Sequence, residues 1–260
     1  MTTTSPPPAD LAPRRPRLRH REAMKLAGTE YDRVAHALAG LSPGDWARRT
    51  DCPDWDVRQL ACHVVGMAAM ASSPRETARQ QSEARREHAV RGGPMVDSLT
   101  AIQVRERRTR TPEQVVAEAR TMARKATRGR RLTPSFIRRR PFAGPQLVNG
   151  VEERWTVGYL VDVILTRDCW MHRVDIARAC ATKPELTADH DGVVVADVVR
   201  EWAERHGRPY RLELTGPAGG HWSSDGPGAA ESIQMDAVEF CRTLSGRETG
   251  VGLLSTEVPF

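Results

Sequence analysis

The sequence lacks any apolar run of about 18 residues, which is the length a membrane-spanning helix needs. Its N-terminal stretch, MTTTSPPPADLAPRRPRLRH, also lacks the apolar segment of a secretory signal peptide. We therefore expect neither a membrane span nor secretion. The prolines in this stretch argue against an amphipathic helix, so the sequence predicts a disordered tail over residues 1–19.

Cysteine is scarce and dispersed. The chain has five cysteines and no CxxC pair: Cys52, Cys62, Cys169, Cys180 and Cys241. This pattern gives no disulfide framework and favours a reducing cytoplasm. Cys62 and Cys169 lie beside the residues discussed below, where each is either a small apolar core residue or a reactive thiol.

Acidic residues are missing from one segment of a chain whose formal net charge is +6. The segment contains Arg124, Lys125, Arg128, Arg130, Arg131, Arg138, Arg139 and Arg140. Three interpretations are a nucleic-acid surface, a rim that attracts an anionic small substrate, and a solvated helix end. Only one aromatic residue, Phe136, is available there for base stacking, so the composition argues against nucleic-acid binding.

Helical periodicity recurs in four long segments. We expect helices over residues 21–41, from about 57 to 71, over 111–128 and over 156–181. Thr111 suits an N-cap, with Pro112 at the first helical position. Residues 73–110 are mixed and charged, and we expect part helix and part mobile loop there. Residues 129–155 form a long connection.

The pattern changes after residue 183. A helix is expected over residues 189–206, strands over 209–216 and 230–236, a short helix over 237–246 and an extended stretch over 251–260. The predicted fold class is mainly α: a four-helix bundle over residues 20–183, followed by a small α+β domain over residues 184–260.

The segment TRDCWMHRVDIARA raises a chemical question. At about 100° per residue, Asp168, His172 and Asp175 continue the apolar stripe of Val157, Val161 and Ile164. Buried carboxylates are costly unless they are paired, hydrogen-bonded or bound to a metal. Two explanations remain open at this point: a buried polar network or a metal site.

Asp168 and His172 are four residues apart, so both side chains lie on adjacent turns of one helix face. His63 lies at the edge of the buried stripe of the second helix. Together the three residues would form a metal site with open coordination positions, suited to zinc and also to iron, manganese or nickel. The spacing of Asp168 and His172 alone is common by chance.

Two motifs resemble a known family. WARRTDCPDWDVRQLACHVVGM resembles the start of the DinB-like metal-binding bundles related to mycothiol-dependent maleylpyruvate isomerase, and the matching residues are Cys52, Pro53, Trp55, Val57, Arg58, Leu60 and His63. The second motif is an acidic residue four before a histidine, then an aspartate and an aliphatic residue. It matches Asp168, His172, Asp175 and Ile176. The tail also resembles the small C-terminal domain of that group, ending in Gly246 and Arg247.

This resemblance implies a divalent metal, typically zinc, on His63, Asp168 and His172, with mycothiol or a similar thiol as cosubstrate. In one respect the chain departs from the isomerase, which has glutamate where this chain has Asp168. Aspartate is shorter by one methylene, so this departure leaves the ligand geometry and the metal open. The implied activity is that of a transferase or cis–trans isomerase acting on a small electrophile. The alternative is a non-catalytic metal-binding module with a stress or regulatory role.

Two further residues have open roles. Asp175 would orient an imidazole or bind the thiol, or else form a buried ion pair with an arginine such as Arg58 or Arg173. Arg247 would bind a substrate carboxylate, or else be an ordinary cation at a helix end.

Overall fold

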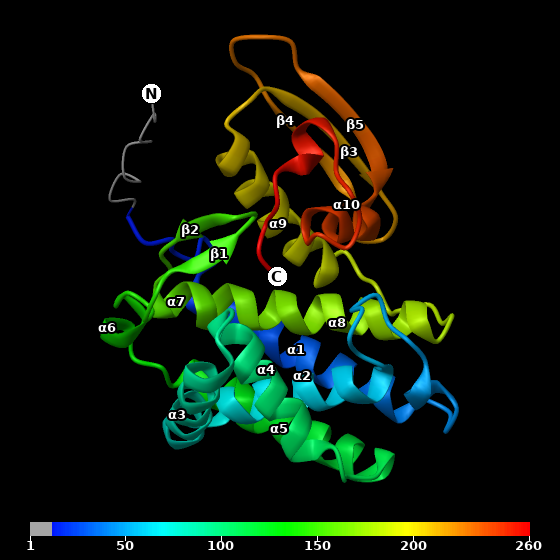
Figure 1. Cartoon of the computed structure of the whole chain (residues 1–260). Helices are drawn as coiled ribbons and strands as arrows, with labels where there is room; N and C mark the ends of the chain where they lie inside the picture. Colours follow the sequence, from blue (N-terminus) through cyan, green and yellow to red (C-terminus); the bar gives the residue numbers. More distant parts are fainter. Residues whose placement is uncertain (1–11) are drawn as a thin grey trace, which may run out of the picture.

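The computed structural model describes residues 12–260 (Figure 1). Of the tail expected over residues 1–19, residues 1–11 lie outside the described part. Residues 12–19 are described, and the Arg14 backbone N–H donates to the Arg154 carbonyl. Within residues 12–260, no helix is both long and apolar enough to cross a bilayer.

Four long helical segments build the larger part of the fold. They are α1 (His20–Ala39), α2 (Val57–Ser72), α5 (Pro112–Arg131) and the continuous run of α7 (Val157–Tyr159), η2 (Leu160–Ile164) and α8 (Leu165–Ala179). Helices α1 and α2 each pack against both α5 and α8. Their common core includes Tyr31, Leu38, Leu60, Val64 and Val115.

Local capping explains where two of these helices begin. The Asp56 side chain accepts from the Gln59 backbone N–H, and the Gln59 side chain in turn accepts from the Asp56 backbone N–H. Thr111 and Gln114 repeat this capping box at the start of α5. The predicted N-cap at Thr111 is therefore confirmed, with Pro112 at the first helical position, where its missing N–H costs nothing.

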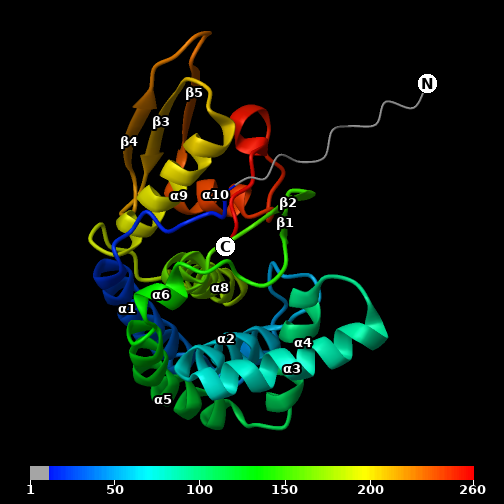
Figure 2. The same cartoon turned by 90° about the vertical axis from the view of Figure 1, so that its left-hand side faces the viewer.

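Residues 73–110, where we expected part helix and part mobile loop, form two helices. Helix α3 (Pro74–Arg91) and helix α4 (Met95–Arg107) run side by side against α2 (Figure 2). Glycines at 92 and 93, both with positive φ, make the turn between them. The apolar stripe that usually packs a helix is weak in both α3 and α4. Ion pairs such as Arg79–Glu106 join the two helices instead.

The long connection from residue 129 to 155 contains a short helix, α6 (Ser135–Arg138), and a hairpin of β1 (Gln146–Val148) and β2 (Val151–Glu153). Asn149 and Gly150 both have positive φ at its turn. Asn-Gly is the favoured pair for such a turn because both residues tolerate the left-handed region.

The C-terminal part is a helix and a small sheet. It comprises α9 (Asp191–His206), β3 (Tyr210–Thr215), β4 (Gly220–Ser224), β5 (Glu231–Asp236), α10 (Ala237–Leu244) and η3 (Gly252–Ser255). The strand order is β4-β3-β5, with β4 antiparallel and β5 parallel to β3. Strand β4 was not predicted, and the expected extended end contains the short helix η3. The mainly α class with a small C-terminal α+β part is confirmed.

Helix α8 lies between two cores. Cys169 and Ile176 belong to the first core, whereas Trp170, Met171 and Val174 join the second core with α9, β3 and α10. The side of α8 opposite the predicted stripe is therefore buried as well. We propose residues 20–183 and 184–260 as the two structural units, which meet along this helix.

Candidate metal centre

His63, Asp168 and His172 come together between α2 and α8. Each offers one ligand atom, and these atoms lie within 4.8 Å of one another. His63 Nε2 lies 3.5 Å from Asp168 Oδ1, and His172 Nε2 lies 3.4 Å from the same oxygen. The three residues that the two motifs singled out therefore share one point in space.

These distances bear on whether the cluster is a hydrogen-bonded network or a metal site. They are long for hydrogen bonds from nitrogen to oxygen, which centre near ~2.9 Å. With bonds of about 2.0–2.2 Å, two ligands of a tetrahedral zinc ion lie roughly 3.3–3.6 Å apart. The observed spacing thus fits ligands around an ion better than groups bonded directly to each other.

The outer nitrogen of each imidazole has an acceptor. His172 Nδ1 lies 3.0 Å from Asp175 Oδ2, and His63 Nδ1 lies 2.8 Å from Gln103 Oε1. An acceptor at Nδ1 favours the tautomer with the proton there, which leaves the lone pair of Nε2 directed at the common point. In its neutral form each histidine could therefore offer Nε2 to a metal ion.

Asp168 has one oxygen without a partner. Its Oδ2 is buried and receives no hydrogen bond from any residue in the described part of the chain. A buried carboxylate oxygen left in this state costs free energy, and a bound cation would remove that cost. This is a second reason why the donor set fits a divalent ion.

The charges of the cluster are strongly coupled. Burial opposes ionisation of Asp168, but the imidazoles of His172 and His63 outweigh it and hold the pKa of Asp168 well below its usual value. Burial likewise opposes protonation of His172, yet Asp168 and Asp175 raise the pKa of His172 well above its usual value. The carboxylates therefore favour a positive charge at this point, whether it is a proton or a metal ion.

The cluster is partly open to solvent. The Asp168 side chain is 15% exposed and that of His172 10%, whereas His63 is almost completely buried. The indole of Trp55, from the first motif, packs at 5.0 Å from the His63 ring and 6.2 Å from the His172 ring. Within residues 12–260, neither Cys62 nor Cys169 belongs to this ligand group.

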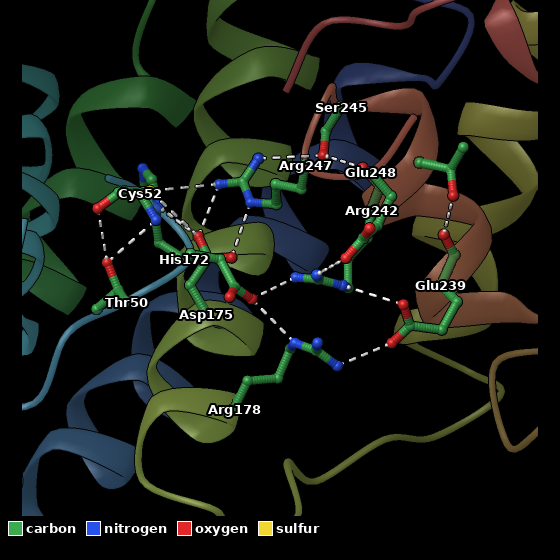
Figure 3. A network of polar contacts seen from close by, with 12 residues as sticks. Thr50, Cys52, His172, Asp175, Arg178, Glu239, Arg242, Ser245, Arg247 and Glu248 are labelled. Atoms are coloured by element: carbon green, nitrogen blue, oxygen red, sulfur yellow. Dashed lines mark hydrogen bonds and ion pairs between the residues drawn. The ribbon is translucent and has the colours of Figure 1, made fainter. Parts of the chain in front are cut away.

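Asp175 connects the cluster to the C-terminal part (Figure 3). Arg247 donates to it through Nε at 2.8 Å and through Nη2 at 2.6 Å, and Asp175 is fully buried. Burial opposes ionisation of Asp175, but His172 and Arg247 prevail and lower its pKa to about 2. Cys52 Sγ lies 3.7 Å from the same carboxylate.

An arginine partner for Asp175 was one of the two predictions, and the structure identifies it as Arg247. Arg58 and Arg173, the arginines suggested from the sequence, have other partners. Arg58 donates to backbone carbonyls of residues 108 and 110, and Arg173 pairs with Glu30 and Asp191. The sequence could not identify Arg247 as this partner, because Arg247 contacts α8 from the loop after α10, 72 residues away from Asp175.

Gln103 was missed by the sequence analysis. It lies on α4, in the segment that was expected to be partly loop, and a single glutamine carries no motif that points to a metal site. Two members of the arginine-rich segment also have structural roles. Arg130 is buried and donates to Thr166 Oγ1, and Arg138 pairs with Asp162.

The fold is that of a DinB-like helical protein with a small C-terminal α+β part. Residues 27–177 match the family described as Mycothiol maleylpyruvate isomerase N-terminal domain, and the chain belongs to this family. No protein of curated function matches the sequence.

Two solved structures share the fold. The crystal structure of the mycothiol-dependent maleylpyruvate isomerase has 16% sequence identity and a TM-score of 0.56, over 93% of this chain and 95% of the other. A mutant of the mycothiol-dependent maleylpyruvate isomerase has 14% identity and a TM-score of 0.55, over 89% and 91%. At these identities the likeness concerns the fold.

Proposed function

We propose that this protein is a metal-dependent enzyme that uses mycothiol or a similar low-molecular-weight thiol, as a transferase or a cis–trans isomerase. The proposal rests on family membership and on one structural observation: the Nε2 atoms of His63 and His172 converge on Asp168 at ligand spacing. Zinc is the favoured ion because two imidazoles and one carboxylate suit it and leave a coordination position free.

The chain's own residues hold and orient the ligands. His63, Asp168 and His172 would bind the ion, Asp175 accepts from the His172 ring, and Trp55 packs beside both imidazoles. A divalent ion at this site would lower the pKa of a coordinated thiol, so that a thiolate forms at neutral pH without a protein nucleophile. Addition of that sulfur to an activated carbon–carbon double bond breaks its π bond and leaves the electron pair on the neighbouring carbon as an enolate. The enolate gives a thioether if it takes up the proton that the thiol lost, or the cis–trans isomer if the carbon–carbon bond rotates and the thiolate leaves.

Arg247 remains a candidate contact for an anionic group of the thiol or the electrophile. Two of its donors already go to Asp175, so any such contact would use a guanidinium that Asp175 holds in place. All five cysteines are free thiols, which agrees with the cytoplasmic location that we expect. The partners in this proposal are small molecules rather than nucleic acid.

Metal analysis tests the binding step. Protein purified without chelators should contain about one zinc per chain, and His63→Ala and His172→Ala should lose it. His36→Ala, an exposed histidine on α1, serves as the matched control and should keep it. Zinc-free wild type, or ligand variants with full occupancy, would remove the basis of the proposal.

Thiol binding tests the second step. With zinc present, mycothiol should raise the midpoint of thermal unfolding, and above its Kd the rise should follow the logarithm of its concentration, as mass action requires. Its S-methylated derivative has no ionisable thiol and should raise the midpoint less. A protein that binds zinc but responds equally to both, or to neither, would instead fit the non-catalytic metal-binding module.

A further inference from the structure

A chain of side-chain amides runs from His63 into the α3–α4 pair. Gln103 Oε1 faces His63 Nδ1 at 2.8 Å, and Gln103 Nε2 donates to Gln80 Oε1 at 3.0 Å. Gln80 Nε2 then donates to the Gly66 carbonyl at 3.2 Å and to Glu76 Oε1 at 2.9 Å. Gln80 and Gln103 are completely buried.

The far end of this chain fixes its direction. A backbone carbonyl and a carboxylate are acceptors only, so the Gln80 group that faces Gly66 and Glu76 must be its NH₂. The Gln80 oxygen is then left to face Gln103, which must present its own NH₂. The Gln103 oxygen therefore faces His63, and the imidazole proton belongs on Nδ1. A flipped Gln103 would set two oxygens against each other.

Gly66 makes this arrangement sterically possible. A Cβ placed on Gly66 would lie 2.5 Å from Gln103 Cβ and 2.7 Å from its Cγ. Real carbon atoms do not approach so closely, so α4 lies against α2 only because residue 66 has no side chain. Gly66 is one turn from His63 on the same helix. Its carbonyl accepts the hydrogen bond from Gln80, and its lack of a side chain leaves room for Gln103.

We propose that Gln80 and Gln103 are positioning residues that hold neutral His63 in the Nδ1-protonated tautomer and so keep its Nε2 available as a metal ligand. This inference rests on the proposed function in one respect, namely that His63 binds a metal. The tautomer itself is a property of the metal-free protein. Removing the partner of a ligand histidine typically weakens metal binding 10- to 100-fold.

The test combines a tautomer measurement with a metal affinity. Protein labelled with ¹⁵N in histidine is studied by NMR without metal, at a pH where His63 is neutral. Wild type should show a protonated Nδ1 and an unprotonated Nε2. In Gln103→Met, which keeps the length of the side chain but has no amide, we expect the proton to move to Nε2, where Asp168 accepts it. Zinc affinity, measured by competition with a chromophoric chelator, should fall 10- to 100-fold.

Two other variants separate positioning from packing. Gln81→Met is the control, because it makes the same substitution at a glutamine of α3 whose side chain forms no hydrogen bond in the described structure. It should change neither the tautomer nor the zinc affinity. Gln103→Glu keeps an acceptor for His63 Nδ1 but loses the donor to Gln80. It should therefore show the wild-type tautomer and most of the wild-type zinc affinity. Thermal unfolding of each metal-free variant shows whether it is folded.

The outcomes distinguish this inference from the proposed function. If Gln103→Met keeps the tautomer and binds zinc within threefold of wild type, the positioning role is refuted and the metal site stands. A wild-type His63 with its proton on Nε2 would also refute it. If wild type binds no zinc, the proposed function fails, and the tautomer in the metal-free protein still decides whether Gln80 and Gln103 orient His63.

Discussion

The ion pair between Arg247 and Asp175 gives the sharpest stability prediction. Asp175 is fully buried, and Arg247 has 14% of its side chain exposed. Replacing Arg247 by methionine removes both guanidinium bonds and leaves a buried carboxylate with His172 as its principal charged partner. Breaking a buried pair from one side typically costs about 3–5 kcal/mol, because the remaining charge has no compensation. We expect Arg247→Met to lose about 3 kcal/mol, the lower end, since His172 stays.

Equilibrium unfolding in urea measures this loss. A domain of ordinary stability, about 5–15 kcal/mol, stays folded after it. The double variant Arg247→Met/Asp175→Asn should regain much of the loss, because asparagine still accepts from His172 without a buried charge. Arg211→Met, an exposed arginine on β3, is the control and should change stability by less than about 0.5 kcal/mol. A loss under ~1 kcal/mol for Arg247→Met, or a double variant no more stable than the single one, would refute this reasoning.

Three further predictions concern pH, packing and metal. Burial opposes ionisation of Glu201, but Arg167 and Arg205 lower its pKa to about 2, so its stabilisation is full above the unfolded value near ~4.3 and disappears as the pH falls through about 2. Glu201→Gln should therefore be less stable than wild type at pH 7, by roughly 3 kcal/mol at most, and urea unfolding should show the gap closing between about pH 4.5 and 2. Gly129→Ala should lower the midpoint of thermal unfolding, because the new Cβ would lie 2.4 Å from the Ala71 carbonyl oxygen of α2. This clash should outweigh the preference of helices for alanine over glycine, which is about 1 kcal/mol. An unchanged or higher midpoint contradicts this packing. A chelator should lower the midpoint of zinc-loaded protein, by the equivalent of about 2.7 kcal/mol from a free zinc concentration of 100 Kd, and an identical midpoint in both states argues against a bound ion.

Sequence patterns located the long helices because each has a capping signal or a clear apolar stripe. Thr111 and Pro112 marked the start of α5, and the apolar positions of α2 placed His63 at the edge of its buried face. The helix pair α3–α4 was not predicted in full, because polar contacts such as Arg79–Glu106 and Gln80–Gln103 hold the two helices together. Such pairs are 20 or more residues apart and leave no periodic trace.

The residues of the candidate site also fall into those that the sequence identified and those that it did not. His63, Asp168 and His172 were found because helical spacing and two motifs point to them. Gln103 and the pairing of Arg247 with Asp175 were not, since each depends on how a separate element packs. The hairpin of β1 and β2 is a different case, because Asn149 and Gly150 are the strongest short signal for a two-residue turn and were available in the sequence.

The aspartate at position 168 ties the ligand spacing to the packing of whole helices. A glutamate at this position would have one more rotatable bond and could adjust its carboxylate by about 1.5 Å without moving the backbone. The carboxylate of Asp168 has little such freedom, so its distance from the imidazoles depends on where α8 lies relative to α2. That position is well determined here, because α8 packs between two cores and Arg247 joins it to the C-terminal part. The C-terminal part therefore helps to set the spacing of the three candidate ligands, although none of them comes from it.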